Sequence, residues 1–174
     1  MPNAAAGYAA PSRWLHWIVA ILLFATLPLG AVIKFVAQDY KLTFYMLHES
    51  LGFAILWLML ARLAVRLIRP PAPRAPMPLW EERLAHLVHG ALYVVLILQP
   101  IFGFLATNAF GFPLEWFWLV PVPSPLGEDQ TLAPRLMAVY VALGYAILVL
   151  FAAHMAGVLW HRLYRRDGTL ARMT

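Results

Sequence analysis

Four long runs of apolar residues dominate the chain, separated by shorter segments that carry most of the charge and proline. About 20 consecutive apolar residues are enough to cross a bilayer as a helix. We therefore expect membrane-spanning helices at about residues 14–33, 44–67, 84–106 and 134–163. The pattern predicts an all-α membrane protein, a bundle of four transmembrane helices. At 174 residues there is room for little else, so one integral membrane domain over residues 1–174 is expected.

The last apolar run places its polar side chains on one helical face. A spacing of seven residues aligns Tyr140, Ile147, His154 and His161, and Gly144 lies on the same stripe. Imidazoles are costly in hydrocarbon and normally point into a helix bundle. This face should therefore look toward the other helices, with Gly144 leaving space there for a broad group.

Composition narrows the class of protein further. The chain is 63% hydrophobic and 12% charged, which is far from a soluble average. It contains no cysteine, which excludes disulfides, c-type haem attachment and cysteine-ligated iron–sulfur clusters. The net charge of +5 is better explained by arginines that orient membrane helices than by binding to nucleic acid.

The basic residues predict an orientation in the membrane. One side of the four-helix arrangement keeps only Lys34, Lys41 and Arg135. The other side carries all the remaining cations: Arg13, Arg62, Arg66, Arg69, Arg74, Arg83, Arg162, Arg165, Arg166 and Arg172. Because basic loops stay in the cytoplasm, we expect both termini to be cytoplasmic.

Two connecting segments have compositions of their own. Residues 69–78 are rich in proline and should form an extended connector. Residues 107–133 contain many aromatic residues but no spanning run, so we expect this segment to lie in the membrane interface.

All six histidines lie in or beside the predicted spans. An interfacial imidazole is the ordinary explanation for any one of them, but every span carries one near an end. Zinc would favour a tight cluster with carboxylates or cysteines, whereas a b-type haem needs one imidazole from each of two facing helices. Near the cytoplasmic face lie His16, His86, His89 and His161, with His154 about 10 Å deeper than His161.

The opposite face offers only His48, and Tyr140 stands at its level on the last helix. The residues therefore support one inner haem, while an outer haem has one clear ligand and an uncertain second.

Several short motifs together resemble a known family. They are His16–Trp17, H-E-S-x-G from His48, H-x-x-H-x-x-x-Y from His86, and H-M-A-G-V-L-W-H from His154 with R-D-G-T-L-A-R-M from Arg166. This pattern resembles the bacterial cytochrome b561 family. That family includes the short superoxide oxidases and is related to the cytochrome b subunits of nickel–iron hydrogenase and formate dehydrogenase. The resemblance covers nearly the whole chain.

The resemblance implies two haem b groups in a four-helix bundle of the bacterial inner membrane. The inner haem iron would be bound by His16 and His154, and the outer one by His48 and a histidine at position 140. This chain has Tyr140 there. Three outcomes are open: Tyr140 ligates, the outer iron is five-coordinate or water-bound, or the outer haem is absent. We favour an outer haem retained on His48 with altered ligation.

Other residues are expected around the inner haem. His89 and His161 are non-ligand candidates that serve its propionates or a quinone, or simply polar residues at the headgroup level. Arg13, Arg62 and Arg162 suit propionates, because guanidinium matches carboxylate geometry, or act only as orientation signals.

The function expected from this resemblance is electron transfer between the quinone pool and a periplasmic donor. Its concrete form is superoxide oxidation coupled to ubiquinone reduction, a quinone-linked oxidoreductase reaction for which the sequence assigns no catalytic residue. Lys34, Lys41 and Arg135 could steer an anionic donor. The alternative is a haem-containing anchor subunit of a dehydrogenase or hydrogenase-type complex, docked through residues 107–133. A haem-free transporter or chaperone-like protein is a third hypothesis. The expected partners are membrane lipid, quinone and a redox partner protein, and not nucleic acid.

Overall fold

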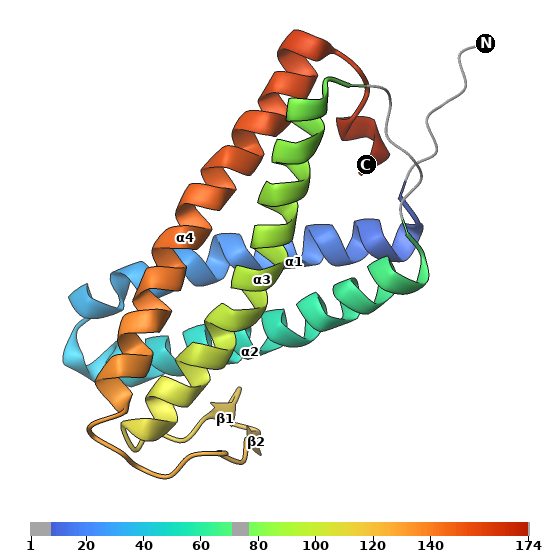
Figure 1. Cartoon of the computed structure of the whole chain (residues 1–174). Coiled ribbons are helices and arrows are strands. Elements are labelled where there is room, and N and C mark those ends of the chain that lie inside the picture. The colour runs from blue at the N-terminus through green and yellow to red at the C-terminus, as the bar shows by residue number, and fades with distance from the viewer. Residues whose placement is uncertain (1–7, 71–76, 174) are drawn as a thin grey trace.

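The computed structural model describes residues 8–70 and 77–173, so the middle of the proline-rich connector, with Arg74, lies outside the described residues. Within them the structure has four long helices: α1 (Ala10–Val32), α2 (Gln38–Ile68), α3 (Leu79–Ala109) and α4 (Ala133–Leu159). The helices α1 and α2 lie side by side as one antiparallel pair and α3 and α4 as a second pair, and the two pairs cross (Figure 1).

Short elements complete the chain. A 3-10 turn (Ile33–Phe35) ends the first helix, a π-helical turn (Trp160–Arg165) extends α4, and a last 3-10 turn covers Leu170–Arg172. Between α3 and α4, strands β1 (Glu115–Trp116) and β2 (Val120–Pro121) form a small antiparallel hairpin in which Trp116 pairs with Val120.

The four helices, with their short extensions, are 26, 31, 31 and 33 residues long and apolar enough to cross a membrane. The predicted all-α four-helix membrane fold is thus confirmed for the described residues. With its extension, each helix is longer than its apolar run. For example, α3 begins at Leu79, and its first turn holds Glu81 and Glu82, whose negative charge suits a helix N-terminus. The cytoplasmic location of the termini stays a prediction.

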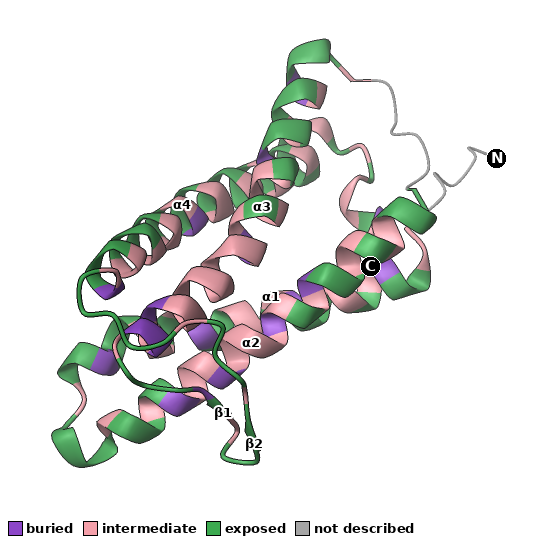
Figure 2. Ribbon diagram, turned by 60° about the horizontal axis from the view of Figure 1, so that its bottom comes forward, coloured by how far each residue is buried: buried purple, intermediate pink, exposed green. Residues whose placement is uncertain are grey.

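The outer surface of the bundle is apolar. Large side chains such as Phe24, Trp57 and Val149 are more than half exposed, and exposed positions follow the outward faces of all four helices (Figure 2). In a membrane protein this surface faces lipid, so the exposure is that of a helix bundle without its bilayer.

The two ends of the bundle differ. We call the end with Arg13, Arg69, Arg83 and Arg165 the basic end, and the end with the β1–β2 hairpin the loop end. At the basic end the C-terminal tail, residues 166–173, folds back onto the start of α1. There the Trp17 indole N–H donates to the Met173 carbonyl at 2.9 Å, and the Tyr8 amide donates to the Arg172 carbonyl at 3.0 Å.

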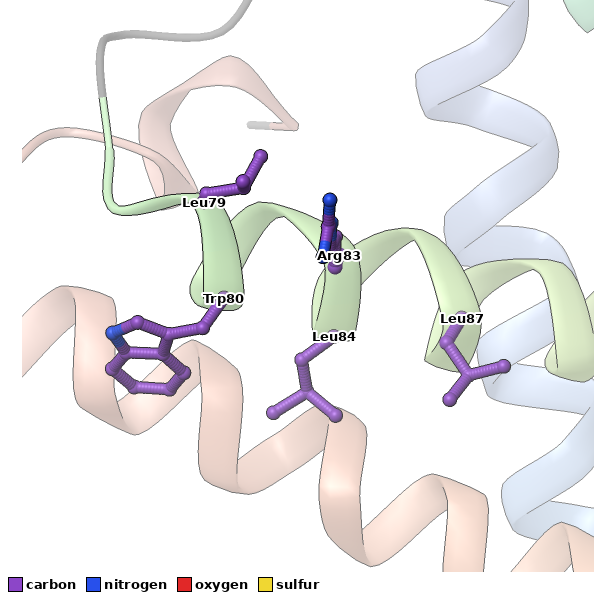
Figure 3. Close-up of a pocket in the computed structure, with 5 residues that line it drawn as sticks. All are labelled: Leu79, Trp80, Arg83, Leu84 and Leu87. Carbon is purple, nitrogen blue, oxygen red and sulfur yellow. The ribbon is translucent and has the colours of Figure 1, made fainter.

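A shallow groove of about 600 Å³ runs along the first turns of α3. Its lining consists of Leu79, Trp80, Arg83, Leu84 and Leu87, and in Figure 3 Trp80, Leu84 and Leu87 point to one side of the helix. No histidine lines this groove, so the candidate chemistry lies elsewhere, inside the bundle.

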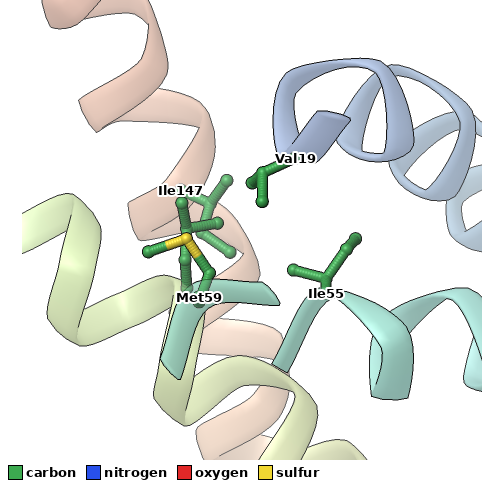
Figure 4. Close-up of a cluster of buried hydrophobic side chains, with 5 residues drawn as sticks. Val19, Ile55, Met59 and Ile147 are labelled. Carbon is green, nitrogen blue, oxygen red and sulfur yellow. The ribbon is translucent and has the colours of Figure 1, made fainter. Parts of the chain in front are cut away.

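All four helices contribute to the apolar core at mid-height. Its buried members are Val19, Ile55, Met59, Leu96 and Ile147 (Figure 4). Ile147 lies on the α4 face that the seven-residue spacing predicted to point inward, and only 2% of it is exposed. The core separates two polar clusters, one toward each end.

Candidate functional site

The inner cluster gathers three histidines from three helices. The ring of His16 on α1 lies 6.3 Å, centre to centre, from the ring of His154 on α4, and the planes are 74° apart. The ring of His89 on α3 lies 5.2 Å from that of His154 at 85°. His16, His89 and His154, which lie on three different helices and far apart in the sequence, thus meet within one layer of the bundle.

The ring nitrogens of this cluster are not equally satisfied. His89 donates its Nδ1–H to the Ala85 carbonyl at 2.5 Å, which fixes the ring against its own helix. The Nδ1 of His16 is buried and has no hydrogen-bond partner among the described residues. Because buried polar atoms are normally bonded, His16 is a place where a ligand group would complete the site.

A cation lies beside the two facing rings. The guanidinium of Arg62, half-buried near the end of α2, interacts electrostatically with both His16 and His154. It also lies 5.4 Å from the centre of the Tyr93 ring, a cation–π arrangement. Arg13 is half-buried one turn before His16.

The remaining histidines of the basic end are oriented differently. His161 lies in the π-helical turn, and its Nδ1 is 2.7 Å from the Asp167 carboxylate in the C-terminal tail. Burial acts to raise the pKa of Asp167, but hydrogen bonds from Thr169 and His161 outweigh it and hold this pKa below its usual value. His86 is exposed and donates to the Glu82 carbonyl.

The outer cluster is a bonded pair. His48 on α2 uses its Nδ1–H to donate to the Thr26 carbonyl of α1 at 3.0 Å. This fixes the neutral tautomer, so Nε2 is an acceptor, and the Tyr140 hydroxyl of α4 donates to it at 2.8 Å. The structure therefore places Tyr140 opposite His48, as the depth estimate from the sequence required.

Two glycines lie behind this pair, Gly30 and Gly103, whereas the sequence predicted such a space-making role for Gly144. A Cβ on Gly30 would lie 2.5 Å from Cε1 of His48, and one on Gly103 would lie 2.9 Å from Cε2 of Tyr140. By contrast, a Cβ on Gly52 would meet nothing within 4 Å. The sequence does not reveal that Gly30 and Gly103 contact these rings, because their depth in the bundle relative to His48 and Tyr140 depends on how the helices cross.

Comparisons with known proteins identify the family of the chain. The family model described as prokaryotic cytochrome b561 matches residues 7–174. The chain belongs to the prokaryotic cytochrome b561 family. It is 30% identical to cytochrome b561 homolog 2 of Escherichia coli (strain K12) over 98% of this chain and 93% of the relative. It is also 29% identical to the probable superoxide oxidase CybB of Yersinia pestis over 95% of this chain and 94% of that protein.

Family membership confirms the resemblance found in the motifs. The chain is thus a b-type haem protein of electron transport and a multi-pass protein of the bacterial inner membrane, surrounded by lipid. Which residues hold the haem, how many haems there are, and what exchanges electrons with them stay predictions.

The inner cluster fits a haem in its spacing and donor set. With metal–nitrogen bonds of about 2 Å, two imidazoles that share one iron have ring centres roughly 6 Å apart. The rings of His16 and His154 are 6.3 Å apart, and they come from two different helices, as a haem between helices requires. His89, whose ring is closer to His154, lies too near for an iron between them and suits the expected non-ligand role.

Proposed function

We propose that this cytochrome exchanges electrons with the quinone pool through a haem b bound by His16 and His154. The single observation that carries the proposal is the pair of half-buried imidazoles from α1 and α4, 6.3 Å apart, with an unpartnered nitrogen on His16. The haem, when bound, supplies the one-electron chemistry. The chain supplies two neutral ligands in surroundings from which most water is excluded.

Other residues of the basic end have supporting roles in this proposal. Arg62 and Arg13 hold the haem propionates by charge-assisted hydrogen bonds. His89 keeps its ring against His154 and limits the orientations that this ligand can adopt. His161, bonded to Asp167, holds a proton where the quinone headgroup approaches, since reduction of a quinone consumes protons as well as electrons.

The direct test uses the purified protein in detergent, prepared with ample haem. Ubiquinol should reduce the bound haem and give the absorption bands of ferrous haem b. His154→Ala should lose the haem spectrum, whereas the matched variant His161→Ala, seven residues along the same helix face, should keep it and slow only the reaction with quinol. Loss of haem in His161→Ala with retention in His154→Ala would reverse the ligand assignment.

A second candidate function is oxidation of superoxide that arrives at the loop end. It is favoured by the name of the Yersinia relative and by three cations at this end, Lys34, Lys41 and Arg135. Cations raise the local concentration of an anionic substrate. The reaction needs an electron route from the loop end to the inner haem. Its test is the rate at which a superoxide-generating system reduces the haem, with superoxide dismutase as the control.

A docked redox protein is the other source of electrons. The loop between α3 and α4 carries Glu128 and Asp129 next to the exposed aromatic side chains Phe112 and Trp118, and it would form the docking surface. A complex that survives extraction in mild detergent would favour this anchor role, while haem reduction by quinol in the isolated chain would favour the cytochrome acting alone.

A further inference from the structure

In the outer cluster, both ring nitrogens of His48 already have hydrogen-bond partners. His48 gives its Nδ1–H to the Thr26 carbonyl, so the only lone pair left on the ring is that of Nε2. The Tyr140 hydroxyl takes that lone pair at 2.8 Å. A haem iron on His48 would need the same lone pair, so iron and the phenol compete for one acceptor.

The distance also opposes an iron between the two residues. Metal–ligand bonds of about 2 Å on each side would separate Nε2 from the phenol oxygen by about 4 Å. The two atoms are 2.8 Å apart, so the rings would have to withdraw by more than 1 Å in total.

The space behind each ring is already filled by backbone. The imidazole of His48 lies against Gly30 of α1 and the phenol ring of Tyr140 against Gly103 of α3, so closely that a Cβ at either glycine would overlap the ring. Through this pair all four helices are tied together at one level. A porphyrin between the rings would require the helices themselves to move apart, which packed interiors resist.

The inner cluster provides the comparison within the same molecule. His16 and His154 stand 6.3 Å apart and His16 has an unpartnered nitrogen, whereas the outer pair is closed and satisfied. We propose that this cytochrome carries a single haem b, at His16 and His154, and that the His48–Tyr140 hydrogen bond stands in place of the second haem. The inner haem in this inference rests on the proposed function. The absence of an outer haem is argued separately, from the contacts of His48 and Tyr140. It departs from the outer haem on His48 expected from the resemblance.

A single inner haem would limit the rate of superoxide oxidation, the second candidate function. Without an iron near the loop end, an electron from superoxide has to travel from that surface past the apolar core to the basic half of the bundle. We therefore expect superoxide to reduce the haem of the natural chain slowly.

The experiment restores the residue that the resemblance implies at position 140. The natural chain, Tyr140→His and Tyr140→Phe are purified after expression with ample haem, and haem per chain is measured by pyridine haemochrome against amino-acid analysis. We expect one haem in the natural chain, two in Tyr140→His and one in Tyr140→Phe. A redox titration should resolve one component in the natural chain and two in Tyr140→His, and superoxide should reduce the haem at least tenfold faster in Tyr140→His.

Substitution of His48, the other residue of the outer pair, gives a second measurement. In the natural chain this measurement does not require a new haem to assemble. His48→Ala should leave the haem count and spectrum of the natural chain unchanged, but it should reduce Tyr140→His from two haems to one. Two haems in the natural chain, or loss of haem in His48→Ala, would overturn the inference. One haem in Tyr140→His would overturn the role given to Tyr140. No haem in the natural chain would instead defeat the proposed function.

Discussion

At the scale of single residues, position 140 decides the character of the outer cluster. Two neutral histidines that each donate Nδ1–H to a helix carbonyl would face one another with two lone pairs, an arrangement that a metal satisfies. Tyr140 instead offers a hydroxyl proton to His48, so the pair satisfies itself. One substitution thus turns a metal-binding arrangement into a closed hydrogen bond that ties α2 to α4.

The charge of Arg62 should tune the inner haem. Its guanidinium interacts electrostatically with both His16 and His154, and a nearby cation favours the ferrous state because that state carries less positive charge. Two unit charges about 10 Å apart, at an effective dielectric constant of about 20, interact by roughly 1.7 kcal/mol, or about 70 mV. We therefore expect Arg62→Gln to lower the haem midpoint potential by tens of millivolts in a redox titration.

Arg66 provides the matched control for this prediction. Its guanidinium lies 5.5 Å from the centre of the same Tyr93 ring, whereas Arg62 is the cation that interacts electrostatically with His16 and His154. Arg66→Gln should therefore shift the potential much less. Equal shifts in the two variants would show that the effect comes from loss of the Tyr93 contact rather than from charge near the haem.

At the scale of elements, the sequence predicted the helices well and their mutual contacts poorly. Helices follow from apolar runs and the inward face of α4 from its spacing, because both depend on neighbours within one helix. The glycines that contact His48 and Tyr140 lie on other helices, at a level set by the crossing of the two pairs. The prediction of an interfacial segment at residues 107–133 missed the β1–β2 hairpin, since two-residue strands leave no periodic pattern.

The hairpin is held against α2 by one serine. Ser50 is fully buried; its hydroxyl accepts the Phe117 amide at 2.8 Å, and its carbonyl accepts the Trp116 indole N–H at 3.1 Å. Phe117 and Trp118 both have positive φ, 49° and 58°, a conformation that costs non-glycine residues about 1 kcal/mol or more each. The bonds to Ser50 help to maintain this turn.

Ser50→Ala should loosen the hairpin, because it leaves the Phe117 amide without its acceptor at a cost of about 1–3 kcal/mol. Hydrogen exchange should increase at residues 115–121, and thermal unfolding in detergent should begin at a lower temperature. Ser124→Ala is the control, since among the described residues the Ser124 hydroxyl bonds only to Leu126 in its own exposed turn. An unchanged exchange rate in Ser50→Ala would mean that the aromatic side chains alone hold the hairpin.

At the scale of the whole molecule, the half of the bundle that carries most of the positive charge also contains the inner histidine cluster. Among the described residues, three lysines and arginines lie toward the loop end, Lys34, Lys41 and Arg135, and the other nine lie in the segments of the basic end. The three histidines of the inner cluster, His16, His89 and His154, lie in the same half as these nine arginines. The positive-inside rule, which predicts that the basic end is cytoplasmic, therefore also predicts that the inner haem lies in the cytoplasmic half of the membrane.

The orientation is tested by reporter fusions, because green fluorescent protein fluoresces only when it folds in the cytoplasm and alkaline phosphatase is active only in the periplasm. We expect fluorescence and no phosphatase activity for fusions after Thr174, and phosphatase activity for an insertion at Gly127 in the exposed loop. The positive-inside rule then places the inner haem in the cytoplasmic half, so that protons for quinone reduction enter from the cytoplasm. The opposite pattern would bring His16 and His154 close to the periplasm, where superoxide could reach the single haem directly and the closed outer pair would no longer slow its reaction.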